Sequence, residues 1–119
     1  MKQSLVKDKS YRFALEIIRL AQGLREQREF ELARQVLRAG TSIGANVEES
    51  LAGVSRRDFV AKMGIASKEA RETHYWLRLL RDSKTVTSER IDSLIAEAEE
   101  LLRMLTAIVK TCKTGTTEL

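Results

Sequence analysis

The sequence contains no proline, one cysteine (Cys112), one histidine (His74) and few aromatic residues, which make up 5% of the chain. A single cysteine excludes an internal disulfide and any multi-cysteine metal site, which suits a reducing cytoplasm. With a single histidine as well, one subunit cannot assemble a histidine- or thiolate-based metal centre. We therefore expect no metal and no cofactor.

Long apolar runs are also missing. No stretch of 18 or more apolar residues occurs, and the first eight residues lack the apolar core of a signal peptide. We therefore expect no contact with a membrane and a cytoplasmic location. The net charge of +4 is modest, and its basic excess falls in residues 1–29 and 54–84, which is compatible with nucleic-acid binding and with simple solubility.

What the chain does contain favours helices. It is 43% hydrophobic and 32% charged over 119 residues, a composition typical of one all-α domain spanning 1–119. Apolar spacings of three and four predict helices over about 9–27, 30–52, 56–82 and 88–113, with loose tails at 1–8 and 114–119. Gly53 and Ser55 are placed to end the second helix and cap the third. Because the links are short, we predict an antiparallel up-down four-helix bundle.

Each predicted helix carries its own apolar stripe. The stripes are Tyr11, Ala14, Ile17, Ile18, Ala21 and Leu24; Ala33, Val36, Leu37, Gly40, Ile43, Gly44, Val47 and Leu51; Phe59, Met63, Ala66, Ala70, Thr73, Leu77 and Leu80; and Ile91, Ile95, Ala98, Leu102, Leu105, Val109 and Cys112. Beside these stripes, the first two helices have further apolar surface at Phe13, Leu15, Leu20, Ile43 and Val47. This surplus favours a subunit contact, and the alternative is a thick core.

The second helix contains two unusual rows. Gly40 and Gly44 lie on one helical face, where the absence of side chains predicts close approach by another helix. Arg38, Ser42, Asn46 and Glu49 form a polar row at spacings of four, four and three, and we expect them to form a structural network facing Glu69 and Glu72 of the third helix.

The carboxylates could alternatively do chemistry. A di-iron site in a four-helix bundle needs a Glu-x-x-His motif on two helices. Here Glu72 is followed three positions later by Tyr75, and Glu49 by Ala52, so the histidines are absent. No glycine-rich phosphate loop is present, because Gly40 and Gly44 lie inside a helix. We expect no enzymatic activity, and an acid–base role for Glu49, Glu69 or Glu72 remains the third-ranked hypothesis.

Three segments of the sequence resemble a known family. They are RAGTSIGANVEE at 38–49, SRRDFVAKMGIA at 55–66 and KEARETHYWLRLL at 68–80. They resemble the bacterial four-helix-bundle family whose members include proteins encoded by intervening sequences in 23S rRNA genes. That family looks related to the accessory variability determinant of diversity-generating retroelements. The match covers about Tyr11 to Lys113, with no departure at the matched positions.

The resemblance implies more than the spacing shows. It implies an up-down bundle assembled as a homopentameric barrel, and a relative that binds nucleic acid and a reverse transcriptase through basic surface. It implies no established enzymatic activity. It also marks Arg38, Ser42, Asn46, Glu49, Glu69 and Glu72 as a polar signature, without assigning that signature a role.

We therefore expect a non-enzymatic homo-oligomeric adaptor that binds RNA, DNA or an RNA-containing complex through basic faces of helices one and three. The candidate contacts are Lys7, Lys9, Arg12, Arg19, Arg56, Arg57, Lys62, Lys68, Arg71, Arg78 and Arg81. The alternative is a protein-interaction scaffold whose basic face docks an acidic protein partner without nucleic acid.

Overall fold

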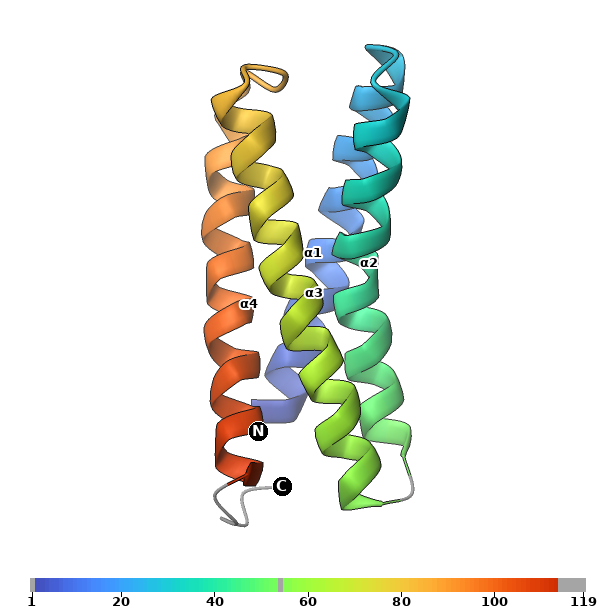
Figure 1. Ribbon diagram of the computed structural model, residues 1–119, viewed down its shortest axis with the longest axis vertical. Coiled ribbons are helices and arrows are strands. Elements are labelled where there is room, and N and C mark those ends of the chain that lie inside the picture. The colour runs from blue at the N-terminus through green and yellow to red at the C-terminus, as the bar shows by residue number, and fades with distance from the viewer. Residues whose placement is uncertain (1, 54, 114–119) are drawn as a thin grey trace.

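The computed structural model describes residues 2–53 and 55–113. It contains the helices α1 (Lys2–Glu26), α2 (Phe30–Ala52), α3 (Arg56–Asp82) and α4 (Arg90–Lys113), and that part of the chain has no strand (Figure 1). The prediction of an all-α chain with four helices is confirmed. The bounds predicted for α2 and α3 match the structure, α1 ends at 26 rather than 27, and α4 begins at Arg90 rather than 88. The predicted tail at 114–119 lies outside the described residues.

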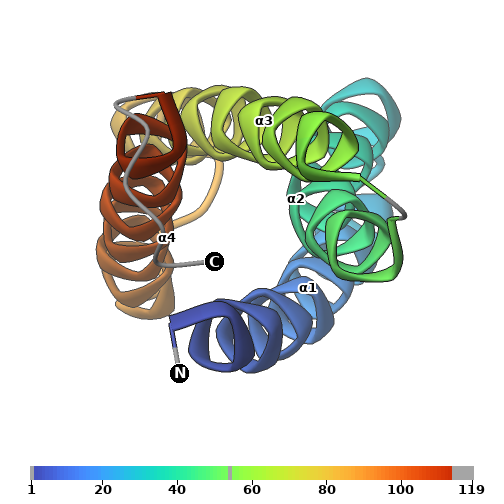
Figure 2. The same ribbon diagram turned by 90° about the horizontal axis from the view of Figure 1, so that it is seen from below.

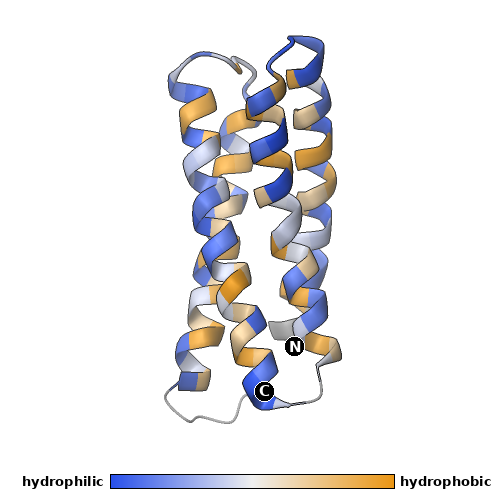
Figure 3. Cartoon of the chain, turned by 45° about the vertical axis from the view of Figure 1, so that its right-hand side comes forward, coloured by the Kyte–Doolittle hydropathy of each residue, from blue (hydrophilic) through white to orange (hydrophobic). Residues whose placement is uncertain are grey.

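The four helices surround one core. In Figure 1 the chain runs upward in α1, downward in α2, upward in α3 and downward in α4. Neighbouring helices pack in the order α1–α2–α3–α4, and α4 meets α1 along a looser seam, as the end-on view in Figure 2 shows. In the described part of the chain, the diagonal pairs α1–α3 and α2–α4 are not neighbouring helices. Apolar and polar residues alternate along every helix (Figure 3), as the periodicity requires.

Of the two residues predicted to end or cap a helix, Ser55 behaves as expected and Gly53 does not. Ser55 caps α3 as predicted, because its side chain accepts a hydrogen bond from the backbone N–H of Asp58 at 3.1 Å. Gly53 ends α2 in an extended conformation (φ −69°, ψ 156°) and not in the left-handed region that favours glycine. The left-handed positions are instead Arg28 (φ 66°) and Lys84 (φ 63°), in the links after α1 and α3. Among the described residues, the backbone positions with positive φ are therefore not occupied by glycine.

The start of α1 corrects two predictions. The helix begins at Lys2, so residues 1–8 are not a loose tail as a whole, and Val6 is fully buried. Tyr11 and Ile18 are not core residues, since they are 59% and 39% exposed. The buried stripe is instead Val6, Ser10, Phe13, Ile17, Ala21 and Leu24. The pattern was misread because a serine occupies a core position while a tyrosine and an isoleucine lie outside.

The core stripes of the other helices follow the predictions more closely. In α3 every predicted position from Met63 to Leu80 is buried, and Phe59 is half-buried. In α4 the stripe is rotated slightly, so that Leu101 and Ile108 are buried where Leu102 and Val109 are only half-buried. The stripe predicted for α2 is buried except at half-buried Leu37 and exposed Leu51.

The surplus apolar surface predicted for α1 and α2 is mostly core. Phe13, Ile43 and Val47 are at most 1% exposed and pack inside the bundle, so the thick-core alternative was correct for them. Leu20 is half-buried against the same core. Leu15 alone among these five is exposed, at 42%.

The glycines of α2 mark its contact with α1. A β-carbon at position 40 would lie 2.7 Å from both Cγ1 and Cγ2 of Ile17. At position 44 it would lie 3.3 Å from the backbone oxygen of Ser10, whose buried hydroxyl donates to the Lys7 carbonyl at 3.1 Å. The glycines and the small Ser10 side chain therefore let two helix backbones approach closely.

We predict that Gly40→Ala lowers the free energy of unfolding by about 1–2 kcal/mol. The methyl group must displace the branched Ile17 side chain, and this cost exceeds the gain in helix propensity. Gly64→Ala is the matched control, since no atom lies within 4 Å of a β-carbon at that position of α3. The control should stabilise the fold by about 0.5–1 kcal/mol. Urea unfolding measures both, and equal stabilisation by the two variants would contradict the close contact.

Candidate nucleic-acid interface

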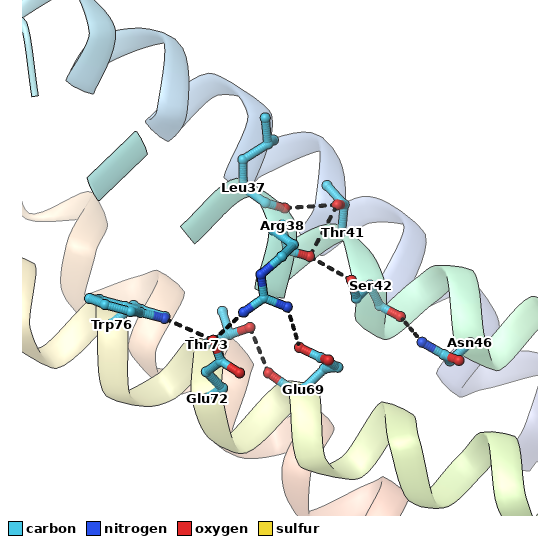
Figure 4. A network of polar contacts seen from close by, with 9 residues as sticks. All are labelled: Leu37, Arg38, Thr41, Ser42, Asn46, Glu69, Glu72, Thr73 and Trp76. Carbon is cyan, nitrogen blue, oxygen red and sulfur yellow. Dashed lines mark hydrogen bonds and ion pairs between the residues drawn. The ribbon is translucent and has the colours of Figure 1, made fainter. Parts of the chain in front are cut away.

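Arg38 of α2 joins two carboxylates of α3. Its Nη1 lies 3.4 Å from Oε1 of Glu69, and its Nη2 donates to Oε2 of Glu72 (Figure 4). The Glu69 side chain is 16% exposed and that of Arg38 is 49% exposed. A guanidinium is suited to this bridging because it presents several donors in a fixed plane. The network thus fixes the register of α2 against α3.

The same network reaches an aromatic side chain. The indole N–H of Trp76 donates to Oε2 of Glu72 at 3.1 Å (Figure 4). The two residues are one helical turn apart in α3. The hydroxyl of Thr73 donates to the carbonyl of Glu69 at 2.7 Å and is buried in the core. The part-buried Trp76 ring is therefore held by a carboxylate that Arg38 holds in turn.

The remaining members of the predicted polar row are placed differently. Ser42 donates to the Arg38 carbonyl at 2.6 Å, and Asn46 donates to the Ser42 carbonyl at 2.9 Å. Both bonds remain within α2, so these two side chains do not bridge to the carboxylates. Glu49 pairs with Lys62 at 2.8 Å, which raises the pKa of that ammonium through the hydrogen bond and the charge attraction.

The single histidine and the single cysteine both have structural positions in the bundle. His74 lies 3.1 Å from Glu99 across the α3–α4 contact, and Cys112 is buried. Among the described residues, no group of three or more His, Cys, Asp or Glu side chains could hold a metal ion. None of the described helices combines the length and apolarity needed to cross a membrane.

A groove of about 280 Å³ follows the loose seam between the end of α1 and the start of α4. Its walls include Leu20, Leu24, Ile91 and Leu94. Beside these walls, the Glu16 carboxylate is paired with Arg19 at 2.6 Å and also with Arg90. This carboxylate is therefore held between two cations.

The predicted basic residues separate into paired and unpaired groups. Paired are Lys9 with Glu100 (3.2 Å), Arg19 with Glu16 (2.6 Å), Lys62 with Glu49 (2.8 Å) and Arg81 with Asp82 (2.8 Å). The hydrogen bond from Arg81 lowers the pKa of Asp82 and raises that of the guanidinium. Arg56 donates to the Cys112 carbonyl at 3.2 Å, and Arg12 to the Asp8 carbonyl at 3.5 Å. Lys7 is exposed.

Four further candidate residues lie on α3. Arg57, Lys68, Arg71 and Arg78 are exposed, and within the described residues the first three take part in no ion pair. Their spacing places them on one side of the helix, together with Tyr75. We call these five residues the α3 outer face. Because α1 and α3 lie on opposite corners of the bundle, Arg12 and Arg19 belong to a different surface.

Tyr75 and Trp76 are residues to which the sequence analysis assigned no role at the candidate site. Tyr75 is 49% exposed, and the guanidinium carbon of Arg78 lies 5.9 Å from its ring centre. A signal was present, since Tyr75 follows Arg71 by four positions and precedes Arg78 by three. Such spacing predicts neighbours on a helix surface.

The chain matches the family of 23S rRNA-intervening sequence proteins over residues 2–107, nearly its whole length. It belongs to this family.

Solved structures include another protein of this kind. The crystal structure of a protein of unknown function from the S23 ribosomal protein family of Bacteroides thetaiotaomicron is 46% identical to the chain, with a TM-score of 0.88. The similarity covers 93% of this chain and 100% of that one. A comparison with curated proteins finds no match. The four-helix scaffold is thus shared, and this chain carries its Arg38 network and α3 outer face on that scaffold.

We predict that Arg38→Ala lowers the free energy of unfolding by about 1–2 kcal/mol. Glu69 and Glu72 would be left facing each other without their shared cation, and Glu69 is poorly exposed. Arg34→Ala on the same helix is the control, because Arg34 pairs with Glu31 only on the surface. The control should cost clearly less stability, because solvent screens an exposed ion pair. Equal losses in urea unfolding would show that the network is no more than a surface ion pair.

Proposed function

We propose that this protein is a non-enzymatic homo-oligomeric adaptor that binds nucleic acid, with RNA as the first candidate, through the α3 outer face. The observation that carries the proposal is the row of exposed cations at Arg57, Lys68 and Arg71, which have no ion-pair partner among the described residues. Such cations are available to phosphates, and release of counterions from the nucleic acid then drives binding. The family's name, which refers to 23S rRNA, makes RNA the partner to test first.

The carboxylates support a non-enzymatic role. Glu69 and Glu72 are both engaged by Arg38, and Glu72 also accepts the Trp76 indole N–H. A general base must be able to reach a substrate proton. Carboxylates that are bound by an arginine of the neighbouring helix instead hold the helices together, and this supports a structural role in preference to acid–base chemistry.

The adaptor is proposed to assemble through α1. Tyr11, Leu15 and Ile18 are spaced by four and three, so they form an apolar stripe on the outside of the helix. They are 59%, 42% and 39% exposed. An exposed apolar stripe of this kind fits a contact with a second copy, and the family resemblance favours a ring of five. A ring would multiply the α3 outer face by the number of subunits and so strengthen a modest charge.

We predict that Leu15→Lys lowers the solution mass measured by light scattering. The ammonium would be placed in the middle of the proposed apolar contact, where its desolvation opposes association. Leu51→Lys, at a residue of α2 with 39% exposure, should leave the mass unchanged. A monomeric parent protein, or an unchanged mass for Leu15→Lys, would contradict assembly through α1.

A triple variant tests the nucleic-acid proposal. We expect Arg57→Gln with Lys68→Gln and Arg71→Gln to weaken RNA binding by at least about tenfold at low salt. The slope of log affinity against log salt should fall by about 2–3, because each lost phosphate contact removes about 0.7–0.9.

The control removes the same charge from paired residues. It combines Arg19→Gln, Arg34→Gln and Arg81→Gln, whose partners are Glu16, Glu31 and Asp82. Its slope should change by less than about 1. Equal effects of the two triples would remove the α3 outer face from the proposal. Absence of RNA and DNA binding at low salt, with recovery of a defined acidic protein, would favour the scaffold alternative.

A further inference from the structure

Tyr75 presents an aromatic surface between two cations of the row, Arg71 and Arg78. The side chain is 49% exposed, three positions from Arg78 and four from Arg71. The guanidinium of Arg78 lies over its ring, 5.9 Å from the centre. From Lys68 to Arg78 the row extends over about 15 Å of helix. This arrangement would match a short ligand chain in which negatively charged groups alternate with flat aromatic groups.

The ring is held in place from inside the bundle. The Trp76 and Tyr75 rings meet in a T-shaped arrangement, with ring centres 5.7 Å apart and an interplanar angle of 65°. The Trp76 indole is tied to Glu72, which is tied to Arg38 of the neighbouring helix (Figure 4). An ordered ring loses little conformational freedom when a ligand stacks on it. The polar network of the family signature therefore positions an exposed aromatic group as well as the helices.

We propose that Tyr75 is a stacking platform for an unpaired base, so that the α3 outer face takes single-stranded nucleic acid in preference to a duplex. This inference rests on the proposed function and names its ligand class. In a duplex the base faces are stacked on one another and are not available to a side chain, whereas unpaired bases stack on aromatic rings and arginine planes. Lys68 and Arg71 then contact the phosphates on one side of the platform.

The chemistry of the row favours a nucleic-acid strand over an acidic peptide. Carboxylates would be served by the cations alone and would leave the Tyr75 ring unused. A nucleobase uses both features, because its π-face stacks on the ring while the flanking phosphates meet the cations. The inference therefore separates two partners that the charge of the surface does not distinguish.

The test measures fluorescence anisotropy of labelled strands at low salt. The probes are an unpaired RNA of about 12 nucleotides, a single-stranded DNA of the same sequence and a duplex of the same length. This length is within the range of site sizes that single-strand-binding proteins cover. We expect the parent protein to bind either single strand more tightly than the duplex. Tyr75→Leu should weaken single-strand binding by about tenfold and leave duplex binding unchanged, while Tyr75→Phe should keep the single-strand affinity.

The chain supplies a matched control and an internal reporter. Phe30 is an aromatic residue of α2 that is 60% exposed, so Phe30→Leu should leave binding of a short strand unchanged. Trp76 is the single tryptophan, next to the platform. Its fluorescence should change when a single strand binds the parent protein, and this change should be lost in Tyr75→Leu. Circular dichroism checks that each variant keeps its helices.

The outcomes separate this inference from the proposed function. Equal affinity for strand and duplex, or equal loss in Tyr75→Leu and Phe30→Leu, overturns the stacking platform while leaving the basic face as a nucleic-acid site. If the Arg57, Lys68 and Arg71 triple also binds as well as the parent protein, the site itself is wrong. Absence of binding to all three probes overturns both.

Discussion

The close approach of α1 and α2 is the contact on which the rest of the bundle depends. Gly40 leaves room for Ile17, and Gly44 lies against the backbone of Ser10, so each glycine is matched by one residue of α1. Glycine lowers helix propensity, and two in one helix are kept only where packing repays that loss. Because the approach leaves little space between the helices, it fixes how far α1 can rotate. That rotation buries Phe13 and turns Tyr11, Leu15 and Ile18 outward.

The opposite flank of α2 is fixed by polar contacts. Arg38 meets Glu69 and Glu72 of α3, while Gly40 and Gly44 face α1. One helix therefore uses close packing on one side and directional charge-assisted bonds on the other. Close packing sets distance, whereas the guanidinium sets the register along the helix axis. Together they place α2 and α3, and hence Trp76, in one arrangement.

Sequence reasoning succeeded where the pattern had one physical meaning. The heptad of α3 and the cap at Ser55 were read correctly because apolar spacing and capping chemistry are local. It failed on α1, where buried Ser10 is tolerated because Gly44 gives it space and its hydroxyl bonds to its own helix. It also gave Ser42 and Asn46 roles across the helix pair that their bonds within α2 do not bear out. These choices are made by tertiary contacts, which spacing does not encode.

The sequence also does not show which basic residues form ion pairs, and this bears on function. By sequence, Arg19, Lys62 and Arg81 resemble Arg57, Lys68 and Arg71, but the fold pairs the first three with carboxylates. A cation already paired must give up its partner to bind a phosphate, whereas an unpaired one gains a partner without that loss. Of the candidate contacts, the fold thereby leaves Arg57, Lys68 and Arg71, on one face of α3, without an ion pair among the described residues, although the charge is spread along the chain. On that helix Tyr75 lies among the unpaired cations, held by a network that begins at Arg38. The residues that fix the bundle and the surface proposed to bind a strand are therefore coupled through Glu72 and Trp76.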